Sequence, residues 1–459
     1  MCTVDFSNPV KVHFIGIGGI SMSGLAEILL DRGFEVSGSD RAPSGITKKL
    51  EGDGAVVYYG QRAANITDDI GLVVYTAAIK EDNPEYAEAV AKGIPMMTRA
   101  QLLGQIMKNY ETNICISGTH GKTTTTSMLT SILLKADADP TVSVGGMLPA
   151  IGGNIRIGRS ECFVTEACEY TNSFLSFFPT VAVILNIDAD HLDFFKDIED
   201  IRHSFTEFAR LLPSDGLLVL NADIDDFAAI IKDVVCPVVT VSSSSPADYT
   251  AADIVFDERG CAGFEVMKNG KAVMHIQLSV PGSHNISNAL AAIAVCDHLG
   301  IPEASVCEGL RDYSGTDRRF QYKGSIKEVT VIDDYAHHPT EIKATLEAAS
   351  NYPHKKLWVV FQPHTFSRTK ALFDEFVSAL SGADEVVLAD IYAAREKDDL
   401  GISSNDLNEA IKNHGTSSHY FGSFDEIENY LLQNCSPGDL LITMGAGDIV
   451  KVADSLLGG

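Results

Sequence analysis

The sequence predicts an α/β protein in which mostly parallel sheets are built from repeated strand, turn and helix units. The chain has 459 residues, and at roughly 100 to 200 residues a domain this length predicts about three domains. Apolar runs alternate along the chain with glycine-rich or polar turns and amphipathic helices, which is the pattern of parallel sheets. We place boundaries near residues 110 and 312 and name the parts the N-terminal block (1–110), the central block (111–312) and the C-terminal block (313–459).

Composition and charge exclude several classes of function. The chain is 45% hydrophobic and 21% charged, which is ordinary for a globular protein. No apolar run approaches the roughly 18 to 20 residues of a membrane span, and residues 1–9 lack the basic start of a signal peptide. A net charge of −27 without a local basic patch predicts no nucleic-acid partner. The nine scattered cysteines form no CxxC pair, so we expect reduced thiols in a cytoplasmic protein.

Apolar runs bounded by turn residues locate the expected elements. In the N-terminal block we expect helices near 23–32 and 100–107. We expect three strands there: one at 10–15, a second that ends near residue 40, and a third at 71–76. In the central block we expect a helix at 284–299 and strands at 113–117, 162–166, 181–187 and 217–220. The serine-rich stretch 241–249 breaks the pattern, and we interpret it as a loop. In the C-terminal block we expect helices between strands near 329–334, 357–361, 385–389 and 440–443.

A glycine turn between a strand and a helix predicts a phosphate-binding loop at Gly118, Thr119, His120, Gly121, Lys122, Thr123 and Thr124. Backbone N–H groups and the helix N-terminus would hold the phosphates of ATP, Lys122 would reach the β and γ phosphates, and the Thr123 hydroxyl would bind Mg²⁺. The loop is shorter than the general pattern, because Ile116 stands where the first glycine is expected. The alternative is a glycine turn that caps an ordinary helix.

Polar residues after other strands extend this predicted site. Glu166 ends an apolar run and would point toward the phosphates, and His191 lies in the polar segment 186–193 after the next strand. Both residues suit metal or substrate binding, and the alternatives are a solvated carboxylate and a hydrogen-bonding histidine. Asn285 and Asn288 share one helix face and suit an adenine edge; simple capping of that helix, with Ser283 at its start, is the alternative.

The first glycine-rich turn has the arrangement of a dinucleotide-binding fingerprint. Gly16, Gly18 and Gly19 follow a strand, and Asp40 ends the next strand about twenty residues later. Ser21 occupies the position of the third glycine, so the fingerprint is incomplete. An NAD-dependent oxidoreductase therefore remains an alternative on the N-terminal block alone.

These motifs together resemble those of the Mur ligase family. The resemblance lies in the ordered segments 118–126, 166–170, 186–193, 282–292, 333–341 and 361–369, and it covers residues from about 10 to 455. Cys168 departs from it, because the family has aspartate at that position. The resemblance implies Rossmann-like first and third domains around a P-loop ATPase-type central domain. It also implies ATP-dependent joining of L-alanine to the lactyl carboxylate of UDP-N-acetylmuramate through an acyl phosphate, in cytoplasmic peptidoglycan precursor synthesis.

The resemblance also assigns residues to roles. It implies catalytic roles for Lys122, Glu166, His191 and Arg318 and metal binding by Thr123, Glu166 and His191, with Arg319 as the alternative to Arg318. It implies further ATP contacts from Asn285, Asn288, Arg318, Asp334 and Tyr335. The UDP-sugar would contact Gly16, Gly18, Gly19, Ser21, Asp40 and Thr76, and the amino acid would contact His337, His364 and Arg368. Arginine suits a carboxylate because of its bidentate fork.

The expected cofactors are ATP and Mg²⁺, and the expected partners are small-molecule substrates of a monomer or homodimer without a membrane span. Two other functions remain open beside the oxidoreductase. One is a ligase that joins a recycled murein tripeptide to UDP-N-acetylmuramate, and the other is a nucleotide-binding switch without catalysis.

Overall fold

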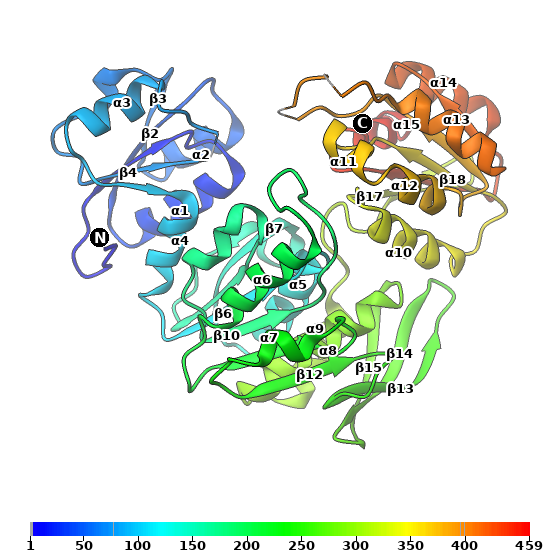
Figure 1. Cartoon of the computed structure of the whole chain (residues 1–459), viewed down its shortest axis with the longest axis horizontal. Coiled ribbons are helices and arrows are strands. Elements are labelled where there is room, and N and C mark those ends of the chain that lie inside the picture. Colours follow the sequence, from blue (N-terminus) through cyan, green and yellow to red (C-terminus); the bar gives the residue numbers. More distant parts are fainter. Residues whose placement is uncertain (1–2, 77, 395, 399) are drawn as a thin grey trace.

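The computed structural model describes residues 3–76, 78–394, 396–398 and 400–459. It contains three sheets, one in each block, and the central block lies between the other two (Figure 1). The eight cysteines in these ranges are free, as predicted, and Cys2 lies outside them. Within the same ranges, no helix combines the length and the apolar character that a membrane crossing needs.

The N-terminal block contains a parallel five-stranded sheet in the order β3-β2-β1-β4-β5. Its strands are β1 Lys11–Ile15, β2 Glu35–Asp40, β3 Val56–Tyr59, β4 Leu72–Tyr75 and β5 Met96–Thr98. Its α-helices are α1 Ile20–Asp31, α2 Gly45–Gly52, α3 Pro84–Ala91 and α4 Arg99–Met107. The chain order reverses on either side of β1, so the turn after β1 lies at a switch point, where α/β sheets bind ligands.

The central block contains a ten-stranded sheet in the order β15-β14-β13-β12-β11-β10-β6-β9-β7-β8. Its strands are β6 Thr112–Ser117, β7 Thr141–Leu148, β8 Gly153–Arg156, β9 Cys162–Glu166, β10 Val181–Ile184, β11 Leu217–Asn221, β12 Val238–Ser242, β13 Tyr249–Phe256, β14 Cys261–Lys268 and β15 Lys271–Pro281. Its α-helices are α5 Lys122–Lys135, α6 Ile198–Ala209, α7 Phe227–Ile231, α8 His284–His298 and α9 Glu303–Asp312. The strands from β13 to β7 are parallel, and antiparallel pairs occur at both ends.

Both faces of this parallel sheet are covered, because its central strands are apolar at successive positions. In β6, Ile114 and Ile116 enter one core with Leu129 of α5, whereas Cys115 between them enters the other core with Phe205 of α6. Successive side chains of a strand point to opposite faces, so a continuous apolar run is buried on both sides. This burial fixes where β6 ends and where the following loop emerges.

The C-terminal block contains a six-stranded sheet in the order β16-β17-β21-β18-β19-β20, which is parallel except for β16. Its strands are β16 Gln321–Ile326, β17 Val329–Asp334, β18 Leu357–Phe361, β19 Glu385–Leu388, β20 Ser417–Tyr420 and β21 Leu440–Met444. Its α-helices are α10 Pro339–Ser350, α11 Phe366–Ala371, α12 Phe373–Leu380, α13 Ser404–His414, α14 Phe424–Asn434 and α15 Val450–Leu456.

The predicted α/β class is confirmed, and one element prediction was wrong in part. The stretch 241–249 was expected to be a loop, but β12 extends to Ser242 and β13 begins at Tyr249, so only 243–248 lies outside the strands. Serine is a common turn residue, yet Ser242 is buried in a strand and its hydroxyl donates to Asp223 at 2.8 Å. This hydrogen bond satisfies the polar side chain in the sheet.

The close contact of α4 with the central block depends on a glycine. A Cβ added at Gly104 would clash with the carbonyl oxygen of Ser176, which ends the 3₁₀ helix η3 Tyr170–Ser176. We expect Gly104→Ala to destabilise the protein by about 1 to 3 kcal/mol, because the backbones must separate. The matched control is Gly52→Ala, since a Cβ at this helical glycine meets no atom within 4 Å; it should stay neutral or gain up to about 1 kcal/mol. Urea unfolding measures both variants, and equal midpoints would contradict this account of the contact.

Candidate active site

The loop between β6 and α5 has the geometry of an anion-binding turn. Gly118 and Gly121 have φ values of 137° and 83°, which favour glycine over other residues. Space also demands glycine, since a Cβ at Gly121 would come within 2.7 Å of Asn288 Oδ1. Asn186, which follows β10, accepts the His120 N–H at 2.7 Å, and its backbone carbonyl accepts the Thr119 N–H at 3.1 Å. The loop is therefore fixed from the neighbouring strand before any ligand binds.

Lys122 begins α5 and folds back over this loop. Its Nζ donates to the carbonyl oxygens of Gly118 and Thr119 and lies 3.1 Å from Glu169 Oε2. Burial, the largest single cause, would lower the pKa of Lys122, but Glu169, Cys168 and Glu166 together outweigh burial and raise this pKa. The lysine is thus a held cation above the phosphate-binding turn.

Thr123 and Glu166 line one cleft together with two glycines of β7, Gly145 and Gly146. A Cβ at Gly145 would lie 2.8 Å from Glu166 Oε2, and a Cβ at Gly146 would lie 3.2 Å from Thr123 Cγ2. The Gly145 N–H donates to Glu166 Oε1 at 2.6 Å. Hydroxyl and carboxylate oxygens are the hard ligands that Mg²⁺ prefers, so these two side chains fit the predicted ion.

His191 lies beside Glu169, which was not among the predicted site residues. The Nε2 atom of His191 is 3.9 Å from Glu169 Oε1, and its backbone has a φ of 54°. Burial lowers the pKa of His191, which favours the neutral ring that can bind a metal. Glu169 is 1% exposed and contacts both His191 and Lys122, so it connects two predicted catalytic residues.

The cleft that contains Thr123 and Glu166, which we call the larger cleft, has a volume of about 990 Å³ and is lined by all three blocks. From the central block it includes Thr119, His120, Gly121, Lys122, Thr123, Glu166, Asp190 and His191. From the C-terminal block it includes Arg318, Arg319, Tyr335, His337 and Glu341. From the N-terminal block it includes Ile20, Ser23, Glu27, Ile46 and Lys49. The structure thus brings the predicted catalytic residues Lys122, Glu166, His191 and Arg318 into one compartment.

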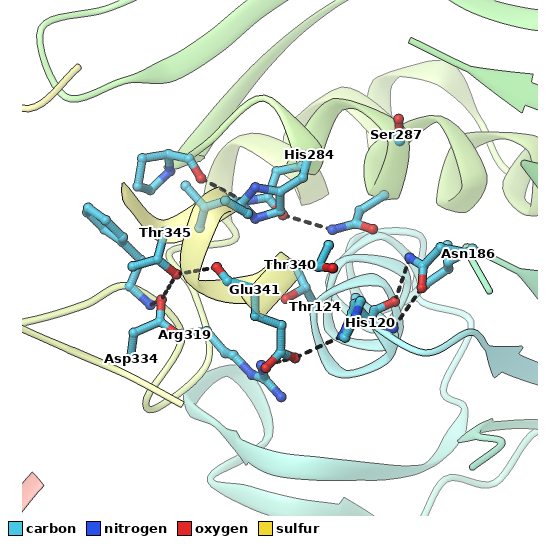
Figure 2. A pocket seen from close by; sticks show the side chains of 18 of the residues that line it. His120, Thr124, Asn186, His284, Ser287, Arg319, Asp334, Thr340, Glu341 and Thr345 are labelled. Carbon is cyan, nitrogen blue, oxygen red and sulfur yellow. Dashed lines mark hydrogen bonds and ion pairs between the residues drawn. The ribbon is translucent and has the colours of Figure 1, made fainter. Parts of the chain in front are cut away.

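A second cavity of about 260 Å³, which we call the ATP-side cavity, adjoins the loop (Figure 2). It is lined by predicted ATP contacts, namely His120, Gly121, Thr124, Asn285, Asn288 and Asp334, together with His284 and Phe320. Asn288 Nδ2 donates to Asn285 Oδ1 at 3.0 Å, and burial raises the pKa of Asp334 to about 6. Ser283 is the N-cap residue of α8, but its side chain makes no capping hydrogen bond, and its hydroxyl donates to Glu347 at 2.7 Å instead.

His120 connects the loop to the C-terminal block across this cavity, as Figure 2 shows. Its Nδ1 is 3.2 Å from Glu341 Oε1 of α10, and its Nε2 is 3.1 Å from Asp188 Oδ2. Burial alone would lower the pKa of His120, but the two carboxylates outweigh burial and raise it to about 9. The ring is therefore an imidazolium at neutral pH and holds the two blocks together.

Among the described residues, His120, Asp188 and His338 form the one group of histidine, cysteine or carboxylate side chains close enough to share a metal ion. Their hydrogen bonds oppose that interpretation. His338 Nδ1 accepts the Thr340 N–H at 3.3 Å, and its Nε2 lies 3.2 Å from the Ala189 carbonyl oxygen. Since His120 Nδ1 is also hydrogen-bonded to Glu341 and its Nε2 forms an ion pair with Asp188, the group is an interblock polar cluster.

The two arginines that follow the central block have different environments. Arg318 donates to Asp333 at 3.0 Å and to the carbonyl oxygens of Gly447 and Gly445 at 3.0 and 2.6 Å. Arg319 lines both the larger cleft and the ATP-side cavity and lies 3.8 Å from Glu341. Both guanidinium groups lie over the Tyr335 ring, at 5.0 and 5.1 Å. A phosphate contact from Arg318 thus requires these bonds to rearrange, whereas Arg319 already faces both compartments.

A third cavity, of about 100 Å³, contains Arg368 of the predicted amino-acid contacts. Arg368 Nε lies 3.0 Å from Asp190 Oδ1, and its Nη1 donates to the His364 carbonyl oxygen at 3.0 Å. His364 is stacked on Tyr392, and its ring is 5.8 Å from that of His337, which lines the larger cleft. Burial, His337 and Arg368 lower the pKa of His364 to about 4. The three predicted amino-acid contacts therefore lie close together.

In the N-terminal turn, hydrogen bonds already engage two of the predicted amides. The Gly16 N–H donates to the Ser39 carbonyl oxygen at 2.9 Å, and the Gly18 N–H donates to Asp40 Oδ2 at 2.9 Å. Asp40 thus shapes the turn, and Gly19 is the N-cap of α1. The first-turn amides of α1, at Ile20 and Ser21, remain for an anion, since helix N-termini leave such groups unsatisfied. Thr76 accepts the Ala78 N–H at 3.3 Å.

Comparison with known families matches all three parts of the chain. Residues 11–111 match the Mur ligase family, catalytic domain; residues 116–296 match the Mur ligase middle domain; and residues 318–447 match the Mur ligase, glutamate ligase domain. The chain belongs to the Mur ligase family.

Individual relatives are similar over the full length. The chain is 57% identical over 457 residues to the UDP-N-acetylmuramate–L-alanine ligase of Agathobacter rectalis, with 100% of each chain covered. It is 59% identical over 458 residues to the protein of the same name from Lachnospira eligens, again with 100% of each covered. The solved UDP-N-acetylmuramate-alanine ligase of Thermotoga maritima is 30% identical, with a TM-score of 0.81 over 97% of this chain and 98% of that one. A murein peptide ligase from Psychrobacter arcticus is 26% identical, with a TM-score of 0.71 over 98% of both chains.

The raised pKa of His120 predicts a pH-dependent contribution to stability. A histidine whose pKa rises on folding stabilises the folded state fully below the unfolded value of 6.5, and this contribution is lost as the pH rises through about 9. We expect the difference in unfolding free energy between wild type and His120→Gln to narrow by about 2 kcal/mol between about pH 7.5 and about pH 10. Urea titrations at both pH values measure it.

The matched control for this experiment is His203→Gln, since His203 is an exposed histidine of α6. Its difference from wild type should stay within about 0.5 kcal/mol at both pH values. A His120→Gln difference that does not change with pH would show that the His120 ring is neutral in the folded protein.

Proposed function

We propose that this protein joins L-alanine to the lactyl carboxylate of UDP-N-acetylmuramate, using ATP and passing through an acyl phosphate. The products are UDP-N-acetylmuramoyl-L-alanine, ADP and phosphate, and the reaction belongs to peptidoglycan precursor synthesis in the cytoplasm. One observation carries the proposal. The cleft with Lys122 and Glu166 and the small cavity with Arg368 share a wall, because Asp190 and His191 line both.

This arrangement suits a two-step ligation. Amide formation from a carboxylate is uphill until the carboxylate is activated, so the lactyl carboxylate would first attack the γ-phosphate of ATP. Phosphoryl transfer depends mainly on positioning and charge neutralisation. Lys122 and Arg319 are cationic side chains beside the phosphate-binding turn, and Arg318 would join them once its hydrogen bonds rearrange. The amine of L-alanine would then attack the acyl carbon and phosphate would leave.

The remaining predicted contacts, those to the nucleotide, the UDP-sugar and the amino acid, are assigned to different parts of the structure. We assign the nucleotide to the loop 118–124 and the cavity of Asn285, Asn288 and Asp334, with Tyr335 at its cleft side. We assign the UDP-sugar to the turn that contains Gly16, Gly18, Gly19 and Ser21, with Asp40 supporting that turn and Thr76 nearby in the same block. His337, His364 and Arg368 would contact the amino acid. The three sheets support division near residues 110 and 312.

Mg²⁺ would be held by Thr123, Glu166 and His191. When bound, the ion neutralises phosphate charge and stabilises the leaving oxygen. The chain's own contribution is to hold these ligands in place, since Gly145 fixes Glu166 through its N–H and Glu169 lies against His191. We propose that the protein acts as a monomer or homodimer on small-molecule substrates alone.

The competing function is the joining of a murein tripeptide to the same UDP-sugar. Two observations favour alanine. The relatives that carry the alanine name are 57% and 59% identical to this chain, whereas the solved murein peptide ligase is 26% identical. The cavity at Arg368 has a volume of about 100 Å³, which suits a small amino acid better than a tripeptide.

Phosphate release tests the proposal directly. The protein is mixed with ATP, Mg²⁺ and UDP-N-acetylmuramate, and release is followed with L-alanine, glycine, tripeptide or no addition. We expect release that needs both the UDP-sugar and L-alanine. Lys122→Ala should reduce its rate roughly a hundredfold or more, because about 3 kcal/mol of charge stabilisation is lost in the transition state.

The control variant is Lys271→Ala, which removes an exposed lysine at the start of β15 and should leave the rate unchanged. Phosphate release that occurs only with tripeptide would show that the protein joins a recycled murein tripeptide to UDP-N-acetylmuramate. Release with no combination of substrates would contradict catalysis and support a nucleotide-binding switch, and a change in nicotinamide absorbance would support the oxidoreductase.

A further inference from the structure

We propose that Asp190 binds the α-ammonium group of the amino-acid substrate, and that in the free protein it occupies the position on Arg368 that the substrate carboxylate takes. This inference rests on the proposed function and adds a residue to it. Asp190 belongs to the central block and Arg368 to the C-terminal block, and they are 178 positions apart in the chain. Together they would recognise both charges of a zwitterion.

The first argument is the geometry of the Arg368 guanidinium. Its Nη1 donates to the carbonyl oxygen of His364 and lies 3.2 Å from the Nδ1 of the same residue, so the segment that precedes α11 fixes that edge. The Nε edge lies 3.0 Å from Asp190 Oδ1. Both side chains are largely buried, at 12% and 8% exposure. An arriving carboxylate that pairs with two guanidinium N–H groups therefore meets Asp190 in the place it needs.

The second argument is charge balance in a small cavity. Its lining contains two carboxylates, Asp190 and Asp193. Asp193 is exposed and accepts the Tyr170 hydroxyl at 2.7 Å, so Asp190 is the buried one. If the substrate carboxylate takes Arg368, Asp190 loses its main cation, and a buried unpaired charge is costly. The substrate ammonium group restores the balance, so one ion pair and one zwitterion become two ion pairs.

The third argument is the position of Asp190 between two compartments. Asp190 and His191 line the small cavity and also the cleft that contains Lys122 and Glu166. An ammonium group held at Asp190 therefore lies at the junction, with the substrate carboxylate behind it at Arg368. This orientation directs the amine toward the cleft in which the lactyl carboxylate is activated. Proximity and orientation of this kind raise the rate of a reaction between two bound groups.

The test compares L-alanine with L-lactate, which keeps the carboxylate and replaces the ammonium group with a hydroxyl. L-alanine is measured as a substrate and L-lactate as a competitive inhibitor, in wild type and in Asp190→Asn. We expect the variant to raise the KM for L-alanine roughly 30-fold or more, whereas inhibition by L-lactate should stay the same or become stronger, because Arg368 is freed from Asp190. The KM values for ATP and UDP-N-acetylmuramate should change less than about threefold. Asp225→Asn, at an exposed position of the same block, is the matched control and should behave as wild type.

An equal loss of affinity for L-alanine and L-lactate would overturn the inference, because Asp190 would then only support Arg368. The inference would also be overturned if Asp190→Asn preferred L-alanine over L-lactate as strongly as wild type does. Should that variant fail to fold, Asp190→Glu keeps the negative charge and is expected to retain most of the preference for L-alanine; loss of the preference would contradict the inference. A wild-type protein that releases no phosphate with L-alanine contradicts the proposed function itself, which separates the two failures.

Discussion

The Glu341 carboxylate is the contact on which the arrangement of the central and C-terminal blocks most depends. It is 13% exposed and lies within 4 Å of His120, His337 and Arg319. Burial alone would raise its pKa, but His337 and His120 outweigh burial and hold the pKa well below its usual value. A carboxylate removed from water needs such partners. Because His120 belongs to the phosphate-binding loop, satisfying Glu341 also places that loop against α10.

A second buried ion pair, Asp190 with Arg368, joins the same two blocks. Residues of these two contacts line all three compartments, namely the ATP-side cavity, the larger cleft and the small cavity. Each compartment needs residues from both blocks, so neither block contains a complete site. Substrate binding must therefore be coupled to the relative position of the blocks, which agrees with a reaction whose substrates bind in compartments shared by two blocks.

Much of the fold could be predicted because its determinants are local. Apolar runs predicted the strands of the parallel core, and Gly118 and Gly121 marked the loop because its positive φ values and close contacts favour glycine. The meander of β13 to β15 was not found, since its strands lie at a sheet end with mixed polarity. Asp190, Glu169 and Glu341 lay within segments recognised from the sequence, but their importance comes from partners far along the chain, such as Arg368 for Asp190. Sequence spacing carries no signal for such contacts.

The central claim is that the carboxylate is activated in one compartment and the amine is presented from another. Positional isotope exchange in ATP, with UDP-N-acetylmuramate present and L-alanine absent, tests it most directly, because reversible acyl phosphate formation scrambles the oxygen label between the β,γ-bridge and the β-phosphate. The account predicts scrambling in wild type and comparable scrambling in Arg368→Ala, although that variant should form little amide. Loss of scrambling in Arg368→Ala would contradict the claim, since the amino-acid cavity would then be required for activation itself.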